Sequence, residues 1–257
     1  MDNMMNYIIG DAFTELHELN NVHGFSQFLK MLDANTAKAG TYVIAQGLDD
    51  ERLTNLQAYL SSLGRLDDFE LIRKQGRRVD KALVHKVNGE NVFITEPEEI
   101  EPDVYRAHLA LDDRCAEMMD HTTGKHLQGN ILIEAARQMF MATVEEHLMD
   151  DKKKGVFSYA LNQMSVEFQN FVFPLEVGIQ LTLRNISWKG EHSLKCIAET
   201  EFIQLDQPCC KITCRGTGYP KSVLKDIEDT RALEVFSMHE SGINTKHKES
   251  DLATESV

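Results

Sequence analysis

The stretch that decides the fold of this chain is residues 120–140, DHTTGKHLQGNILIEAARQMF. Two histidines, His121 and His126, precede a single glycine, Gly129, and a nearly continuous apolar run follows it. Three polar side chains interrupt this run: Glu134, Arg137 and Gln138. Because an unpaired charge is costly to bury, these side chains must pair with one another or serve a site.

The apolar run predicts a buried helix from about Asn130 to Met149. Its apolar side chains leave no fully polar face: Ile131, Leu132, Ile133, Ala135, Ala136, Met139, Phe140 and Met141. A helix that is apolar almost all round must be surrounded by other elements. We therefore expect a sheet that curls around this helix.

Residues 77–220 predict the strands of that sheet. The segment VGIQLTLRNISW alternates cleanly, and four apolar side chains share one face: Val177, Ile179, Leu181 and Leu183. SLKCIAETEFIQL and CCKITCRGTGY continue the pattern, which predicts an antiparallel sheet with one buried face. Between ALVHKV and NVFIT, the pair Asn88-Gly89 is a strong hairpin signal and predicts a two-stranded turn there.

The flanking segments predict two further units. Residues 1–76 predict a mixed α/β extension with strands at TYVIAQ and FELIRK. Its first helix, SQFLKMLDANTAK, has Ser26 as a possible N-cap, and its second, DDERLTNLQAYLSSLG, begins after Asp49 or Asp50. Residues 221–257 predict one polar helix, SVLKDIEDTRALEVFSM, followed by a disordered tail that has too few apolar residues to fold alone.

Composition excludes several function classes. The chain of 257 residues has a formal net charge of −14, so it lacks the basic footprint of a nucleic-acid-binding protein. No apolar run is long enough to span a membrane, and the N-terminus has no basic region typical of a secretory signal, so we expect a cytoplasmic protein. The exception to the acidic composition is IRKQGRRVDKALVHK, which is either a solvated linker or a docking patch for a phosphate or an acidic carrier protein.

The cysteines predict neither disulfides nor a metal site. Their number is odd and their spacing matches no metal-binding pair: Cys115, Cys196, Cys209, Cys210 and Cys214. We expect small buried residues, and the histidines have no convincingly spaced third ligand. No cofactor is indicated.

The central stretch resembles the A-factor biosynthesis (AfsA-type) hotdog family, within the broader hotdog thioesterase and dehydratase superfamily. The resemblance covers roughly residues 78–220 and rests on the string Glu134-Ala-Ala-Arg137-Gln138, with weaker matches at Val84-His85-Lys86, NVFITEP and FQNFVFPLEVG. It implies an α+β hotdog fold, in which an antiparallel sheet wraps a long central helix. Two features depart from the pattern: Gln128-Gly129 stands where Pro-Gly is usual, and Asp120 occupies the position of the dehydratase histidine.

The resemblance implies an enzyme that acts on acyl, or β-ketoacyl, thioesters of acyl carrier protein or coenzyme A. The leading hypothesis is acyl transfer or condensation in signal-molecule or secondary-metabolite biosynthesis, as in γ-butyrolactone formation. An acyl thioesterase or 3-hydroxyacyl dehydratase is one alternative, and a non-catalytic acyl-binding or interaction module is another. A single hotdog unit implies a homodimer.

The predicted site follows from the same stretch. We expect three catalytic residues: Glu134, His121 and Arg137. We expect four substrate-binding residues: Asp120, Gly129, Asn130 and Gln138. Burial would raise the pKa of Glu134 and allow acid–base catalysis, or Glu134 and Arg137 could form a purely structural ion pair. The resemblance further implies that the helix N-terminus at Gly129 and Asn130 stabilises an oxyanion, while Arg137 would suit a phosphorylated acceptor.

Overall fold

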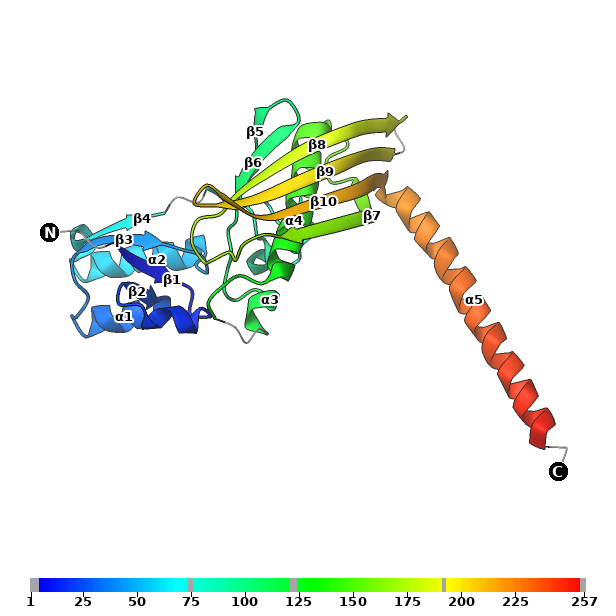
Figure 1. Cartoon of the computed structure of the whole chain (residues 1–257), viewed down its shortest axis with the longest axis horizontal. Coiled ribbons are helices and arrows are strands. Elements are labelled where there is room, and N and C mark those ends of the chain that lie inside the picture. The colour runs from blue at the N-terminus through cyan, green and yellow to red at the C-terminus, as the bar shows by residue number, and fades with distance from the viewer. Residues whose placement is uncertain (1–4, 74–75, 121–123, 191–192, 255–257) are drawn as a thin grey trace.

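The computed structural model describes residues 5–73, 76–120, 124–190 and 193–254, without side chains from residue 242 onward. Within this part of the chain, a small parallel sheet lies beside a larger antiparallel sheet, and one long helix leaves the far end (Figure 1). We propose residues 1–76, 77–220 and 221–257 as three units. Among the described helices, none is long and apolar enough to span a membrane.

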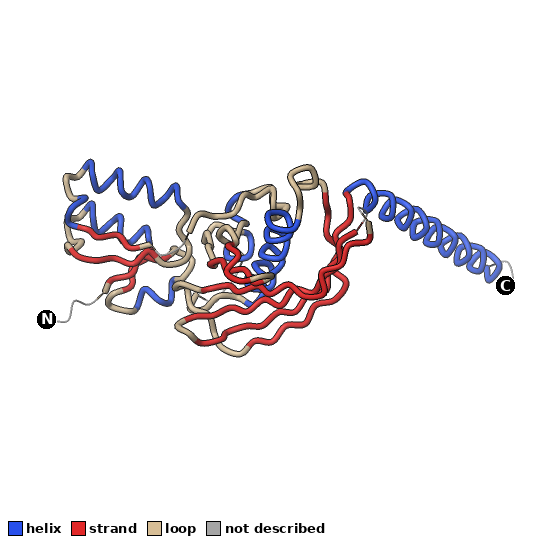
Figure 2. The backbone as a smooth tube through the Cα atoms, turned by 90° about the horizontal axis from the view of Figure 1, so that it is seen from above, coloured by secondary structure: helices blue, strands red, loops and turns tan. Residues whose placement is uncertain are grey.

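The N-terminal sheet is parallel, with strand order β2-β1-β3-β4. Its strands are β1 (Asn6–Ile9), β2 (Val22–Gly24), β3 (Gly40–Ile44) and β4 (Phe69–Ile72). Helices α1 (Phe25–Asp33) and α2 (Asp50–Ser62) pack on one side of these strands (Figure 2). Their shared core contains Phe28, Leu32, Leu56 and Leu60. The mixed α/β extension predicted from the sequence is therefore present.

The two helix starts differ in how well they were predicted. Asp49 caps α2, because its Oδ1 accepts a hydrogen bond from the Arg52 N–H at 2.8 Å. Ser26 is not the cap of α1, because the helix already begins at Phe25. The remote Asp11 supplies the carboxylate instead, accepting from the Ser26 N–H at 2.9 Å and from its hydroxyl at 2.6 Å. A local pattern cannot reveal a cap from a residue so far away in sequence.

The larger sheet is antiparallel, with strand order β5-β6-β8-β9-β10-β7. Its strands are β5 (Glu98–Glu101), β6 (Val104–His108), β7 (Phe157–Phe168), β8 (Gly178–Lys189), β9 (Ser193–Gln204) and β10 (Gln207–Pro220). The predicted alternation on β8 is confirmed, since Ile179, Leu181 and Leu183 are all buried. All five cysteines are free and buried.

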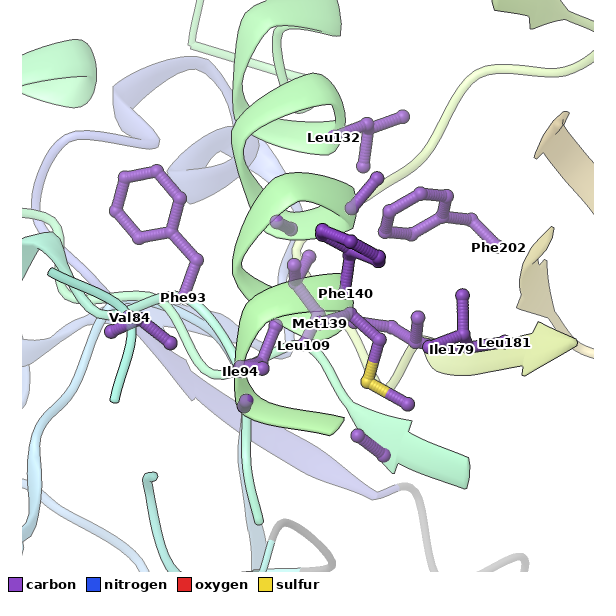
Figure 3. Packing of buried hydrophobic residues seen from close by; sticks show 14 of the residues in the cluster. Val84, Phe93, Ile94, Leu109, Leu132, Met139, Phe140, Ile179, Leu181 and Phe202 are labelled. Atoms are coloured by element: carbon purple, nitrogen blue, oxygen red, sulfur yellow. The ribbon is translucent and has the colours of Figure 1, made fainter. Parts of the chain in front are cut away.

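The central helix is α4 (Gly129–Thr143), which continues as a π-helical turn over Val144–Leu148. The sheet curves around it in Figure 2. Figure 3 shows Phe202, Ile179 and Leu181 on one side of α4 and Phe93 and Val84 on the other. The helix is buried because it is covered on both sides, as its composition predicted.

The hairpin predicted at Asn88-Gly89 is wrong. Residues 80–86 form successive turns, and residues 89–91 form a short 3₁₀ helix. Among the described residues, only the isolated bridges Arg78–Thr95 and Ile94–Leu109 pair this region with strand-like backbone. The backbone groups that a hairpin would pair are used by α4 instead: the Gln138 side chain bonds the Phe93 N–H and the Asn91 carbonyl.

The parallel and antiparallel sheets are joined by polar side chains. The buried Gln46 accepts from the Leu111 N–H at 2.8 Å and donates to the Leu109 carbonyl at 2.9 Å. Arg52 of α2 pairs with Asp112 at 3.0 Å and Asp113 at 2.8 Å. The N-terminal unit is thus fastened to the chain that leads into the central helix.

The C-terminal helix α5 (Lys221–Thr254) extends beyond the end predicted at Met238. Every side chain from Lys225 to Ser241 is exposed. A helix without tertiary packing relies on its own hydrogen bonds, so α5 contributes little to the core. Where the sequence predicted a disordered tail after this helix, the backbone continues as helix to Thr254.

Candidate functional site

Glu134 sits at the centre of a cluster of charged and polar side chains on α4. Arg137 donates to both of its carboxylate oxygens, through Nε at 2.7 Å and Nη2 at 2.8 Å. Lys86 Nζ lies 2.8 Å from Glu134 Oε1, and Gln138 Nε2 donates to the same oxygen at 3.0 Å. Residues spaced three and four apart on a helix share one face, which brings Arg137 and Gln138 to Glu134, whereas Lys86 comes from the loop of residues 80–86.

These contacts lower the pKa of Glu134, whereas the sequence predicted a raised pKa. Burial by itself would raise the pKa of the carboxyl group, but hydrogen bonds from Arg137, Lys86 and Gln138 outweigh it and lower the pKa to about 2. The prediction of a raised pKa is therefore wrong. Glu134 is ionised at neutral pH, so it holds no proton to donate and is a weak base.

Both the oxygen and the nitrogen of the Gln138 side-chain amide form hydrogen bonds within the protein. Its side chain is fully buried, Oε1 accepts from the Phe93 N–H at 2.8 Å, and Nε2 donates to the Asn91 carbonyl and to Glu134. Both donor hydrogens are thus used. The predicted substrate-binding role of Gln138 remains a prediction, and binding through the amide would require it to exchange one of these partners.

A second feature lies at the N-terminal end of the helix. A hollow of about 470 Å³ opens beside the α4 N-terminus and is lined by His126, Leu127, Gly129, Leu132, Phe168, Gln169, Asn170, Phe171 and Val172. Phe168 and Phe171 are exposed, although large apolar side chains are usually buried. Exposed aromatic rings around a hollow are typical of a site that accepts an apolar ligand.

Gly129 brings the backbone of α4 close to this hollow. A Cβ atom at Gly129 would lie 2.6 Å from Phe168 Cζ, so any side chain there would displace the ring. Among the described residues, neither the Gly129 N–H nor the Asn130 N–H has a hydrogen-bond acceptor. Free N–H groups in the first turn of a helix favour a ligand oxygen that carries negative charge.

The predicted site residues therefore fall into separate groups. Glu134, Arg137 and Gln138 come together, whereas Gly129 borders the hollow on another face of α4. At about 100° per residue, Leu132 and Glu134 point to nearly opposite sides of the helix. The side chains of Asn130 and Asp120 are exposed, and His121 lies outside the described residues.

Sequence reasoning overlooked two side chains in these groups. His126, to which the sequence assigned no site role, lines the hollow, and its ring lies 4.8 Å from that of Phe171. Lys86 was read as part of a predicted strand, yet it is a direct partner of Glu134. The family-like string Val84-His85-Lys86 could have drawn attention to Lys86. The position of His126 five residues after His121, just before the helix, could have drawn attention to His126.

A second buried carboxylate, Glu145, was also missed. It is fully buried in the π-helical turn, accepts from the Tyr159 hydroxyl at 2.7 Å and accepts from the Gly155 N–H at 2.6 Å. These bonds tie the end of α4 to the start of β7. Glu145 is spaced eleven residues after Glu134, so it extends the same polar stripe of the helix.

Among the described residues, no group of three or more histidine, cysteine, aspartate or glutamate side chains could hold a metal ion. Burial raises the pKa of the thiols of Cys115 and Cys196 to about 11, so both stay protonated at neutral pH.

Comparisons with known proteins agree with this architecture. The family model of the A-factor biosynthesis hotdog domain matches residues 68–220, which is more than half of the chain. The search of curated proteins gave no match. A long helix wrapped by an antiparallel sheet is the hotdog arrangement, and the family match and the observed topology both support it.

Several solved structures are similar at low identity. A mutant thioesterase from Pseudomonas aeruginosa shares 14% identity, with 68% of this chain and 96% of that chain covered and a TM-score of 0.37. A thioesterase from Haemophilus influenzae shares 12%, with 68% and 94% covered and a TM-score of 0.36. A hypothetical thioesterase from Streptococcus pneumoniae, solved with coenzyme A, shares 10%, with 49% and 85% covered and a TM-score of 0.33.

Proposed function

Because this chain belongs to the A-factor biosynthesis hotdog domain family, we propose that it acts on acyl thioesters of coenzyme A or acyl carrier protein. The finer proposal is transfer or condensation of a β-ketoacyl group onto a second substrate, in the synthesis of a signal molecule or secondary metabolite. A cytoplasmic location is part of the proposal. The observation that carries it is the apolar hollow against the unpaired N–H groups of the first turn of α4.

The hollow suggests how a thioester would bind. The acyl chain would lie against Leu132, Phe168 and Phe171, and the thioester carbonyl oxygen would face the Gly129 and Asn130 N–H groups. Those N–H groups would stabilise the negative oxygen of a tetrahedral intermediate. Because Gly129 has no side chain, the carbonyl can approach the backbone closely.

His126 is the titratable group of this hollow, and we propose it as the acid–base residue. It would take the proton from the acceptor hydroxyl as that oxygen attacks the thioester carbon. The carbon–sulfur bond then breaks, and the proton passes to the departing thiolate. His121 remains a prediction in the same role.

The Glu134–Lys86–Arg137 cluster has a different place in the proposal. Because its carboxylate is ionised and paired with Lys86, a structural role that holds α4 against residues 84–93 fits it better than proton transfer. The catalytic roles predicted for Glu134 and Arg137 stay predictions, and so does an acceptor phosphate at Arg137. Arg137 remains 36% exposed, so a ligand could reach its guanidinium from solvent.

A homodimer is part of the proposal, and the edge of β7 supports it. β7 pairs with β10 on one side and, among the described strands, has no neighbour on the other. A twelve-residue edge strand with an exposed leucine, Leu161, is a ready template for pairing with another chain. Antiparallel pairing of two β7 strands would extend the sheet across both copies.

One observation favours a second candidate function, a non-catalytic acyl-binding module. The carboxylate and amide of the family string, Glu134 and Gln138, are consumed by contacts within the chain. If the string serves packing alone, the hollow would bind an acyl thioester without turning it over. Thioesterase or dehydratase chemistry remains a further alternative, and it would need no acceptor.

The test is mass spectrometry of reactions with a medium-length β-ketoacyl-coenzyme A, with and without dihydroxyacetone phosphate. Wild type, His126→Gln and Glu134→Gln are compared, and circular dichroism shows that each is folded. We expect a phosphate-containing adduct from wild type and strongly reduced adduct from His126→Gln. Free acid or dehydrated product without acceptor would favour the thioesterase or dehydratase. Binding without any product would favour the acyl-binding module.

A further inference from the structure

The basic stretch of residues 72–86, which the sequence left open as a solvated linker or a docking patch, has most of its charges paired with carboxylates. Arg73 pairs with Asp50, Arg77 lies 3.6 Å from Glu96, and Lys86 pairs with Glu134. Arg78 is mostly buried near Asp112, at 3.9 Å. Lys74 lies outside the described residues. Among its described cations only Lys81 is exposed without a carboxylate partner, so this stretch presents less unpaired positive charge than the group described next.

A different group of cations gathers where α5 leaves the large sheet. The C-terminal ends of strands β8 and β10 and the N-terminal ends of strands β7 and β9 meet at this side of the molecule (Figure 1). We call its lysines the basic end: Lys152, Lys153, Lys154, Lys189 and Lys221. The Lys221 N–H donates to the Val156 carbonyl at 2.8 Å, which places the 150–156 loop against the start of α5.

Three lysines of the basic end have no carboxylate partner among the described residues. Asp150 and Asp151 offset only Lys153, at 3.3 Å, and Lys154, at 3.4 Å. Lys152, Lys189 and Lys221 are exposed and form no ion pair there. An unbalanced positive surface is notable on a chain with a net charge of −14.

Apolar side chains lie within this positive surface. Trp188 is 37% exposed, Lys153 Nζ lies 5.4 Å above its ring, and Phe157 packs edge-on against it at 6.0 Å. Val156 is 46% exposed. A partly exposed tryptophan that packs against Phe157 and lies under a lysine resembles the anchor of a protein interface more than a plain solvated surface.

We infer that the basic end docks an acidic carrier protein that delivers the acyl thioester. An acidic partner is repelled by the chain as a whole, so its docking needs a local positive surface that steers and orients it. The unpaired lysines would meet the partner's carboxylates, and Trp188 would supply the apolar contact. This inference rests on the proposed function for the reason to deliver an acyl group.

The position of the basic end fits the proposed dimer. It lies beside Phe157 at the start of β7, whereas the hollow lies beside Phe168 at its end. A strand of twelve residues is roughly 40 Å long, so a carrier docked there is far from the hollow of the same chain. Antiparallel β7 pairing would place the start of one β7 near the end of the other, and the carrier would serve the hollow of the partner copy.

The test measures binding of a fluorescently labelled bacterial holo acyl carrier protein to the full chain by anisotropy. The double variant Lys152→Glu/Lys189→Glu reverses two unpaired lysines of the basic end. The matched control Lys30→Glu/Lys38→Glu reverses two exposed lysines of the N-terminal unit and changes the net charge equally. Hydrolysis or transfer of a coenzyme A thioester, which needs no carrier, is measured in parallel.

We expect the basic-end variant to raise the Kd about tenfold or more, the control to change it less than about twofold, and salt to weaken wild-type binding. Equal loss in both variants, or loss in neither, would overturn the inference. The inference would also be overturned if wild type bound no carrier but bound anionic lipid vesicles, and if the basic-end variant lost that lipid binding. If carrier binding requires the basic end but no thioester is turned over, the proposed function is contradicted and the docking inference stands.

Discussion

Lys86 Nζ lies 2.8 Å from Glu134 Oε1, and this contact joins a turn-rich loop to the central helix. Glu134 thereby receives two cations, since Arg137 binds the same carboxylate. Four residues along the helix, Gln138 completes the link to the loop through Phe93 and Asn91. The polar side chains of a buried helix are thus explained by the segment that covers them.

Removing the charge of Glu134 should destabilise the protein. Glu134→Gln leaves Lys86 and Arg137 without their shared carboxylate, which is only 16% exposed. We expect the free energy of unfolding to fall by about 1–3 kcal/mol, measured by denaturant titration. Lys81→Gln, on the same loop, is the control and should change stability little. Unchanged stability together with lost turnover would show that Glu134 is catalytic rather than structural.

The same carboxylate should make stability depend on acidic pH. The pKa of Glu134 is about 2 in the folded protein against an ordinary value of 4.5, so the folded state binds this proton less readily. Its stabilising contribution is present above about pH 4.5 and is lost as the pH falls toward 2, amounting to roughly 3 kcal/mol. Unfolding titrations over this range should show a steeper loss for wild type than for Glu134→Gln. Parallel curves would contradict the assigned shift.

Gln138 should be needed for folding more than for chemistry. Gln138→Met keeps a similar volume but leaves the buried Phe93 N–H and the partly buried Asn91 carbonyl unpaired. We expect a loss of about 2–4 kcal/mol. Thermal unfolding followed by circular dichroism measures it, with Gln57→Met on the exposed face of α2 as the matched control. A variant of wild-type stability that no longer binds acyl thioester would instead support the predicted substrate contact.

Gly129→Ala should weaken substrate binding while leaving the fold intact. The added methyl group would lie 2.6 Å from Phe168 Cζ, but this ring is 58% exposed and can move into the hollow. We expect KM for an acyl thioester to rise about tenfold, with a stability change below about 1 kcal/mol. Gly178→Ala is the control, because its added atom would meet only the Ile203 carbonyl at 3.8 Å. Equal effects of both variants on KM would contradict the hollow as the binding site.

The edge of β7 should control self-association. Lysines on an edge strand disfavour pairing with another chain, so Leu161→Lys/Gln163→Lys should raise the dimer dissociation constant at least about tenfold. Sedimentation velocity over a concentration series measures it, with Gln180→Lys on the outer face of β8 as the control. A wild-type chain that stays monomeric, or a variant that dimerises equally well, would contradict pairing through β7.

Patterns with strong local periodicity were predicted well. The central helix and the alternation of β8 appear as expected, and of the two predicted caps of α2, Asp49 and Asp50, the structure uses Asp49. The hairpin at Asn88-Gly89 and the cap at Ser26 were wrong, since in each case a distant side chain, Gln138 or Asp11, took the backbone groups. A local sequence pattern indicates hydrogen-bond partners that are near in sequence. It does not reveal a side chain that is distant in sequence and that the fold brings close to the same backbone groups.

The sequence by itself determined that a helix apolar on nearly every side had to be enclosed, and that long alternating strands would enclose it. It also carried the resemblance to the family whose model matches residues 68–220. Only the tertiary structure decided that Glu134 would be ionised rather than protonated, because burial and ion pairing shift the pKa in opposite directions. Which effect prevails depends on whether Lys86 and Arg137 reach the carboxylate, and that geometry is set by the packing of the covering loop on the helix.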